Sequence, residues 1–388
     1  MEILVFLTWL MLGLTLYVYV GYPVIVGLWA RLWGQSIERA DIVPKVTLII
    51  AAYNEEVVIA EKIENSLQLD YPSEQLQIMV VADGSDDDTA TIAQDYADKG
   101  VVTLFSPERR GKSAALNRGV KLASGDILIF SDANAYYYED AIQKVVRNFT
   151  DPTVGGVSGK KTVRASEGSA TETEGMYWKY ESFIKKSESK SGSTAGVVGE
   201  MNAICKELYD DIPEDIINDD FYLALVVMGK GYRVLYEPEA VSWELPSLSV
   251  QDDNKRRRRM TAGRYQQMFM FSLWRSIGLA NIFRVVSHKF FRLLLPFFML
   301  GALVFNILVV AFPPRPMSLI VTLVLQLVAY DIALLGYFLE RSGRKMKIPA
   351  AAYYVVNSNI ASIRGLMRYL RDEQGVLWEK AQRVAQKN

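Results

Sequence analysis

Long apolar segments near both ends of the chain constrain its fold more than any other feature. Residues 3–29 carry no charge, and two further apolar runs occupy 293–312 and 317–339. A membrane-spanning helix needs about 20 predominantly apolar residues. We therefore expect three transmembrane helices, which flank a polar region of the chain.

Charges beside the apolar runs predict their orientation. Glu2 precedes the first run, Arg31 ends it, and a basic loop at 341–347 follows the third. Basic residues favour the cytoplasmic side of a membrane. We expect an uncleaved N-terminal anchor in a multi-pass protein of the inner or plasma membrane, with the polar region in the cytoplasm.

A fourth apolar stretch, 348–363, is ambiguous because it is short and contains Asn357 and Asn359. If it crossed the membrane, the basic tail 364–388 would lie outside, against the charge rule. We favour a genuine span, with a re-entrant or interfacial segment as the alternative.

Composition excludes several classes of protein. Lys and Arg number 43 and Asp and Glu 44, so the net charge of -1 argues against nucleic acid as a partner. Cys205 is the single cysteine, which excludes an intrachain disulfide and a cysteine zinc site. His288 is the single histidine and lies beside an apolar run, so we expect a structural role for it.

The region 41–250 alternates strand-like and helix-like patterns. Apolar runs at 45–52, 76–82, 101–105 and 126–130 are followed by helical spacing at 55–69, 87–97, 112–123 and 139–149. Such alternation predicts an α/β fold whose mostly parallel sheet is covered by helices on both faces. Ligands of these folds bind at the carboxyl ends of the strands. The polar stretch 187–193 is predicted to be a loop.

Acidic residues follow two of these predicted strands. Asp83 and Asp132 end the runs at 76–82 and 126–130, the pair Asp219–Asp220 opens a later helical pattern, and arginines fill 256–259. Carboxylates near a basic cluster suggest a site for a metal ion and an anionic leaving group.

Two common nucleotide-binding motifs do not fit. A dinucleotide-binding turn needs Gly-x-Gly-x-x-Gly, but the first predicted strand is followed by Tyr-Asn-Glu-Glu at 53–56. Gly111-Lys112-Ser113 matches the end of a P-loop, but Ser106 replaces its first glycine. A dehydrogenase or a P-loop ATPase is therefore disfavoured.

The remaining motifs resemble those of inverting family 2 membrane glycosyltransferases with a GT-A (Rossmann-like) domain, a group that includes hyaluronan and cellulose synthases and ceramide glucosyltransferases. The motifs are Ala-Tyr-Asn-Glu-Glu at 52–56, Asp-Gly-Ser at 83–85, Arg-Gly-Lys at 110–112, Asp-Ala-Asn at 132–134, Asp-Asp-Phe at 219–221 and Arg-Arg-Arg-Arg-Met at 256–260. The resemblance covers about residues 45–265.

The resemblance implies a role for each motif. A divalent cation, Mg²⁺ or Mn²⁺, would be held by Asp132 and Asn134 and would neutralise the diphosphate leaving group. Asp220, with Asp219, would supply the general base that deprotonates the acceptor hydroxyl. The substrate-binding residues implied are Tyr53, Glu55 and Asp83 near the nucleotide base, Lys112, Asp132, Arg256 and Arg259 near the phosphates, and Glu200 and Asn202 in the acceptor pocket.

Each residue also has a plainer interpretation. Asp83, Asp132 and Asp220 are residue types that cap helices and form turns, and Lys112 suits a solvated first helical turn. The arginine run could anchor the chain to anionic lipid. The metal motif has Asn134 in place of a second aspartate, and Met260 replaces the tryptophan of the family's motif.

These observations predict a membrane hexosyltransferase that moves a sugar from a nucleotide diphosphate sugar, which we expect to be UDP-linked, to a hydroxyl in polysaccharide synthesis. Single transfer to a membrane lipid and a catalytically silent membrane scaffold are the alternatives. Because few spans are present, a polymer would need a homo-oligomer or a secretion partner. The predicted units are an N-terminal transmembrane helix (1–33), the GT-A domain (41–250), the arginine motif with interfacial helices such as 260–274 (251–291), the C-terminal transmembrane helices (292–363) and the basic tail (364–388).

Overall fold

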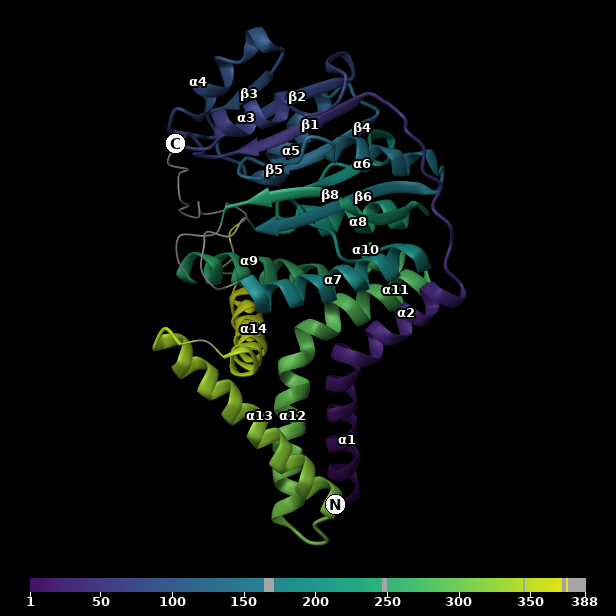
Figure 1. Cartoon of the computed structure of the whole chain (residues 1–388), viewed down its shortest axis with the longest axis vertical. Coiled ribbons are helices and arrows are strands. Elements are labelled where there is room, and N and C mark those ends of the chain that lie inside the picture. The colour runs from purple at the N-terminus through teal and green to yellow at the C-terminus, as the bar shows by residue number, and fades with distance from the viewer. Residues whose placement is uncertain (164–170, 246–249, 345, 372–374, 376–388) are drawn as a thin grey trace.

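The computed structural model describes residues 1–163, 171–245, 250–344, 346–371 and 375. An α/β unit lies at one end of the molecule and apolar helices lie at the other, with a layer of helices between them (Figure 1). The strands are β1 (Val46–Ala52), β2 (Leu76–Asp83), β3 (Val102–Ser106), β4 (Ile127–Asp132), β5 (Tyr136–Tyr137), β6 (Val154–Val163), β7 (Asn202–Cys205) and β8 (Arg233–Glu244). The helices are α1 (Glu2–Leu16), α2 (Tyr22–Leu32), α3 (Ile59–Leu67), α4 (Thr89–Gln94), α5 (Lys112–Leu122), α6 (Ala141–Val146), α7 (Thr171–Ser191), α8 (Asp219–Gly229), α9 (Val250–Phe269), α10 (Phe271–Arg275), α11 (Leu279–Val285), α12 (Phe291–Ala311), α13 (Met317–Arg341) and α14 (Lys347–Leu370).

The strands form one sheet in the order β3-β2-β1-β4-β7-β6-β8-β5. The pairs β3–β2, β2–β1 and β1–β4 are parallel, whereas β7 is antiparallel to both β4 and β6. The α/β class is confirmed. The sheet is mixed, and β6 and β8 also pair in parallel, so four of the seven strand pairs among the described residues are parallel. The strands β1 to β4 are those that the alternation pattern predicts.

The sheet is buried because its central strands are apolar on both faces. Along β1, Ile49 and Ala51 pack with α5 and α8 on one face, whereas Leu48 and Ile50 pack with α3 and α6 on the other. Successive side chains of a strand point to opposite faces, so a continuous apolar run gives a strand covered on both sides.

The predicted loop at 187–193 is wrong. Helix α7 continues to Ser191, and Glu188 and Ser189 are buried in it. The Ser189 carbonyl accepts a hydrogen bond from Arg233 at 2.9 Å, and the Ser191 hydroxyl accepts one from Arg284 at 3.2 Å. Contacts from β8 and α11 thus satisfy polar groups that would otherwise face water.

Among the described residues, three helical segments are long and apolar enough to cross a membrane: Glu2–Leu32, Leu279–Ala311 and Met317–Arg341. The first bends at the π-helical turn η1 (Tyr17–Gly21), and the second contains another, η6 (Val286–Phe290). Helices α1 and α12 lie side by side below the layer of helices (Figure 1). The three spans expected from the sequence therefore have matching helices.

The fourth apolar stretch forms part of α14, a helix of 24 residues that is not among these three segments. The helix continues past the boundary predicted at 363, through Arg364 and Arg368 to Leu370. Helix α14 packs against α9 and α13. Gly365 permits the close approach to α9, since a Cβ atom there would lie 2.5 Å from Cγ2 of Thr261.

The segment 260–274, predicted as one interfacial helix, is divided between α9 and α10, with a break at Met270. Helices α7 and α9 lie in the layer between the sheet and the apolar helices (Figure 1). Tyr265 of α9 is buried, and its hydroxyl donates to the Leu293 carbonyl of α12 at 2.8 Å. This helix is thus packed into the protein on the side that carries Tyr265.

Candidate active site

Two of the acidic residues singled out in the sequence, Asp132 and Asp219, meet around one lysine. Lys112 begins α5, and its Nζ lies 2.8 Å from Oδ1 of Asp132 at the end of β4 and 3.3 Å from Oδ2 of Asp219 at the start of α8. The pKa of Lys112 is raised by these carboxylates, even though burial opposes the ammonium form. The ammonium thus bridges two carboxylates that belong to separate elements.

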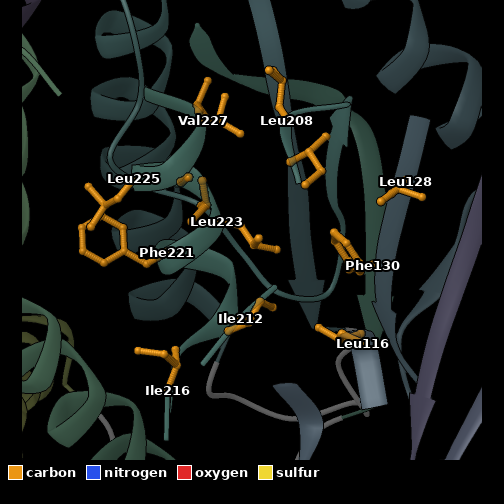
Figure 2. Packing of buried hydrophobic residues seen from close by; sticks show 14 of the residues in the cluster. Leu116, Leu128, Phe130, Leu208, Ile212, Ile216, Phe221, Leu223, Leu225 and Val227 are labelled. Atoms are coloured by element: carbon orange, nitrogen blue, oxygen red, sulfur yellow. The ribbon is translucent and has the colours of Figure 1, made fainter. Parts of the chain in front are cut away.

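An apolar core fixes the start of α8 against the sheet. Phe221, Leu223 and Leu225 of α8 lie in one buried cluster with Leu128 and Phe130 of β4 (Figure 2). Because these side chains are buried on both partners, α8 has little freedom to slide. The adjacent pair Asp219–Asp220 is therefore held next to the end of β4.

Asp220 has the electrostatic environment of a general base. Burial, with a further contribution from the neighbouring charge of Asp219, raises the pKa of Asp220 to about 6. Its Oδ1 accepts a hydrogen bond from the Phe221 backbone N–H at 2.8 Å. Gly199 passes close by, since a Cβ atom there would lie 3.6 Å from Nζ of Lys112 and 3.8 Å from Cβ of Asp220.

Asp83 is fully buried and already satisfied by the chain. Its Oδ2 accepts hydrogen bonds from the backbone N–H groups of Arg110 and Gly111 at 3.0 and 2.6 Å, and Arg118 pairs with Oδ1 at 2.8 Å. Recognition of a nucleotide base by Asp83 stays a prediction. It requires the 109–111 loop to move, because both carboxylate oxygens are engaged.

Tyr53 lies beside the same loop. The Arg109 guanidinium lies 3.6 Å from the centre of the Tyr53 ring. Gly84 has a φ of +66°, and a Cβ atom there would lie 2.5 Å from Cβ of Arg109, so this turn requires glycine. Stacking of a nucleotide base on Tyr53 also stays a prediction. Such stacking on the ring face that Arg109 covers would displace the guanidinium.

Glu200 and Arg256 belong to a ring of four charges that the sequence does not reveal. Arg256 contacts Glu200 at 2.9 Å and Glu244 at 3.0 Å, and Lys161 pairs with both glutamates, at 2.6 Å to Glu244. Lys161 and Glu244 were missed, because a single charge at a strand end has no distinctive spacing. Arg256, predicted to bind phosphate, is thus paired with two carboxylates.

The remaining predicted site residues are Arg259, Asn202, Asn134 and Glu55, and they differ in their contacts. Arg259 forms no ion pair with the described part of the chain, and burial lowers its pKa while Asp132 and Asp219 oppose that change. Asn202 opens β7 and is buried, and its Nδ2 has no hydrogen-bond partner among the described residues. Asn134 is buried, and the Glu55 backbone N–H donates to Thr89 at 2.7 Å.

The residues present suit a hard divalent cation that is bound partly by substrate. In the described ranges, no group of three or more His, Cys, Asp or Glu side chains could hold a metal ion alone. Mg²⁺ is often bound by one or two carboxylates together with substrate phosphates. Asp132 supplies such a carboxylate. The Lys112 ammonium already places one positive charge between Asp132 and Asp219.

Comparison with known proteins agrees with the fold and the motifs. Residues 47–212 match the family model described as Glycosyl transferase family 2. The chain is 30% identical over 213 residues to the poly-beta-1,6-N-acetyl-D-glucosamine synthase of Staphylococcus aureus (strain COL), an alignment that covers 53% of this chain and 51% of that protein. The synthase of Staphylococcus epidermidis is 26% identical over 238 residues, covering 60% and 57% of the two chains.

The chain thus spans about half the length of these curated relatives. Among solved structures, the mannosyltransferase PcManGT from Pyrobaculum calidifontis, in complex with GDP-Man and Mn²⁺, matches 95% of this chain and 99% of its own. The TM-score is 0.71 and the sequence identity 24%, which supports the same fold. The matched segment thus resembles glycosyl transferase family 2 in sequence, and the chain shares the fold of the mannosyltransferase.

Proposed function

We propose that this protein is a membrane-integral inverting glycosyltransferase that moves a sugar from a nucleotide diphosphate sugar, which we expect to be UDP-linked, to an acceptor hydroxyl. The observation that supports it best is the meeting of Asp132, Lys112 and Asp219 beside Asp220. These charged groups come from the end of β4 and the starts of α5 and α8, and they concentrate one basic and three acidic groups at a strand end, where ligands of such folds bind. The apolar helices would hold the catalytic domain on the cytoplasmic face of the membrane.

The chain's own residues can carry out the proton transfer. Asp220 accepts the proton of the acceptor hydroxyl, and its pKa of about 6 lets it be ionised near neutral pH while it remains an effective base. The acceptor oxygen forms a bond to the anomeric carbon as the bond to the diphosphate breaks. A single displacement of this kind inverts the anomeric configuration.

The leaving group needs positive charge. Lys112 and Arg259 lie beside Asp132 and would contact the diphosphate, and Arg256 would join them when it leaves Glu200 and Glu244. When bound by Asp132 and Asn134, Mg²⁺ or Mn²⁺ would supply Lewis-acid neutralisation of the phosphate oxygens.

The acceptor has two candidates. The names of the curated relatives favour a growing polysaccharide. The layer of helices that joins the catalytic unit to the apolar helices would keep the active site near the membrane surface, which favours a membrane lipid instead (Figure 1). A chain with three candidate spans provides a small wall for a polymer channel, so the polymer would require a homo-oligomer or a secretion partner.

The test is turnover of the purified protein with a panel of nucleotide sugars, membrane lipid and Mg²⁺ or Mn²⁺, with product mass as the readout. We expect Asp220→Asn to lower kcat by about 10²- to 10⁴-fold, while nucleotide affinity changes less than about twofold. Glu214→Gln is the control, because Glu214 and Arg110 form a half-exposed pair. Unchanged turnover in Asp220→Asn would reject the base assignment, and no turnover in any wild-type sample would favour a silent scaffold.

A further inference from the structure

Three basic side chains lie near Asp220, two of them on helices of the layer between the sheet and the apolar helices (Figure 1). They are Lys185 of α7, Arg264 of α9 and Lys289 of η6. Lys185 is 5% exposed, and the other two are partly buried. Lys289 lies within electrostatic reach of both Arg264 and Lys185, and both lysines act on the charge of Asp220.

Within the described ranges, none of these three cations forms an ion pair or a hydrogen bond through its side chain. Lys289 lies 5.4 Å from the centre of the Phe221 ring, and Lys185 lies 5.1 Å from that of Tyr236. Burying an unpaired charge is costly, and placing three like charges together adds to this cost. Such a cluster is explained when an anion completes it.

The nearest glutamates are already engaged elsewhere. Glu181 pairs with Arg292 at 2.6 Å and with His288 at 2.8 Å. Glu188 contacts His288 at 2.8 Å and accepts hydrogen bonds from Thr194 and from the backbone N–H of Ala195 at 2.9 and 3.0 Å. Glu200, which also acts on Lys185, pairs with Lys161 and with Arg256 at 2.9 Å. In the part of the chain that the structure describes, Asp220 forms no ion pair with either lysine. The cluster therefore keeps an excess of positive charge.

We propose that Lys185, Arg264 and Lys289 bind the phosphoryl group of a phospholipid acceptor and so present its hydroxyl to Asp220. A planar guanidinium with two ammonium groups is a common arrangement for phosphate oxygens. This inference rests on the proposed function and names the class of acceptor. In the transfer, the lipid hydroxyl gives its proton to Asp220 and its oxygen bonds to the anomeric carbon. The nucleoside diphosphate leaves with the electron pair of the broken bond.

The position of the cluster favours a lipid over the donor as the source of this phosphoryl group. The donor's diphosphate has its own cations, Lys112 and Arg259, which act on Asp132 and Asp219. Lys289, by contrast, lies in the candidate membrane-spanning segment Leu279–Ala311. A headgroup at the membrane surface can therefore reach it while the lipid chains stay in the bilayer.

The state of Lys185 agrees with this interpretation. Burial lowers its pKa, although Glu181, Glu200, Glu188 and Asp220 all oppose the change. A bound phosphoryl group would favour the ammonium form. Removing the unpaired charges should accordingly stabilise the protein in the absence of a ligand.

The test measures lipid binding by the full-length protein in a neutral detergent, with native mass spectrometry as the readout. The variant is Lys185→Met combined with Lys289→Met, and the control is Lys186→Met, which removes an exposed lysine of the same helix. The probes are short-chain phosphatidylglycerol, diacylglycerol and glycerol phosphate. Phosphatidylglycerol is a lipid with both a phosphoryl group and a hydroxyl. Diacylglycerol is a lipid with a hydroxyl alone, and glycerol phosphate carries the phosphoryl group without a lipid.

We expect phosphatidylglycerol to bind wild type and the control equally and the double variant at least tenfold more weakly, with little binding of the other two probes. The unliganded double variant should melt at a temperature equal to or above that of wild type, and its nucleotide affinity should be unchanged. Equal lipid binding by the double variant, or no binding by wild type, would overturn the site. Tight binding of glycerol phosphate would show that the site does not need a lipid. Tight binding of diacylglycerol would show that it does not need a phosphoryl group. If wild type does not bind a nucleotide sugar at all, the result would instead count against the proposed function.

Discussion

At the scale of single residues, Asp220 gives a signature in both rate and stability. Its folded pKa of about 6 lies above the ordinary value, so the folded protein holds the proton more tightly than the unfolded chain. The proposed base, Asp220, would be inactive when protonated, so kcat should rise with pH through an apparent pKa near 6. A pH–rate profile that is flat from pH 5 to 7 would contradict this assignment.

The same shift predicts that ionised Asp220 destabilises the fold. The destabilisation begins above the unfolded pKa near 4 and is complete above pH 6. Asp220→Asn should therefore be more stable than wild type at pH 7.5, by about 1–3 kcal/mol, and should lose this advantage as the pH falls to 4. Denaturant unfolding of both proteins at the two pH values checks the prediction.

Lys62 supports the active site from behind. It is fully buried, and its Nζ donates to the Ala135 carbonyl at 2.5 Å and lies 4.0 Å from the centre of the Tyr137 ring. The Tyr137 hydroxyl in turn donates to the Glu200 carbonyl at 2.8 Å. Lys62 therefore connects the loop after Asp132 with the loop that carries Glu200.

Lys62→Met should raise the Mg²⁺ or Mn²⁺ concentration for half-maximal activity by about tenfold or more, as expected when a group that positions a metal ligand is lost. Glu64→Gln, on the exposed side of the same helix, should leave it unchanged. Burial lowers the pKa of Lys62 to about 7. Because the folded state binds this proton less tightly, wild type should also gain stability relative to Lys62→Met between pH 7 and 10. If Lys62→Met and Glu64→Gln require the same metal concentration for half-maximal activity, Lys62 does not position the metal ligands.

The candidate site was predictable where its residues follow apolar strands. Asp132 and Lys112 stand at the end of β4 and the start of α5, and the structure brings them together with Asp219. The pairing of Arg256 with Glu200 and Glu244 was not predictable, because it joins residues that are 56 and 12 positions apart without any local pattern.

At the scale of elements, sequence patterns predict the first four strands closely but not the second half of the sheet. β1 and β2 are apolar runs that bury both faces, so their composition alone indicates their structure. β6 contains glycines and lysines, and β8 contains arginine, proline and glutamate. Their burial depends on pairing with each other and on the charge ring, which a single segment does not reveal.

The contact between α9 and α14 gives an element-scale prediction. A side chain at Gly365 would collide with Thr261, and both residues lie on packed helices. Gly365→Val should destabilise the protein by about 1–3 kcal/mol, the range for overpacked sites. Gly13→Ala is the comparison, because a Cβ atom at Gly13 meets no neighbour within 4 Å. Equal melting temperatures for the two variants would show that α14 is not held in this position.

At the scale of the whole molecule, a buried polar network joins the apolar helices to the catalytic domain. Glu188 of α7 accepts a hydrogen bond from the Tyr22 hydroxyl of α2 and contacts His288 of η6 at 2.8 Å. His288 also contacts Glu181, which confirms the structural role expected for the single histidine. The network thus connects two of the apolar segments, Glu2–Leu32 and Leu279–Ala311, to α7.

Glu188→Leu should destabilise the protein by about 3–5 kcal/mol, because it removes the partner of several buried donors and of the Nδ1 atom of His288. Glu214→Gln should change stability by less than about 1 kcal/mol, since the Glu214–Arg110 pair is half exposed. Thermal unfolding in detergent distinguishes the two results. A small effect in Glu188→Leu would mean that water replaces the carboxylate.

The layer of helices between the sheet and the apolar helices also determines how an acceptor would find the active site. A phospholipid that reaches the cluster of Lys185, Arg264 and Lys289 searches the plane of the bilayer rather than the volume of the solution. The quantity that governs the transfer rate is then the mole fraction of acceptor in the membrane. Diluting reconstituted vesicles in buffer should leave the rate per enzyme unchanged, whereas diluting the acceptor with inert lipid should lower it.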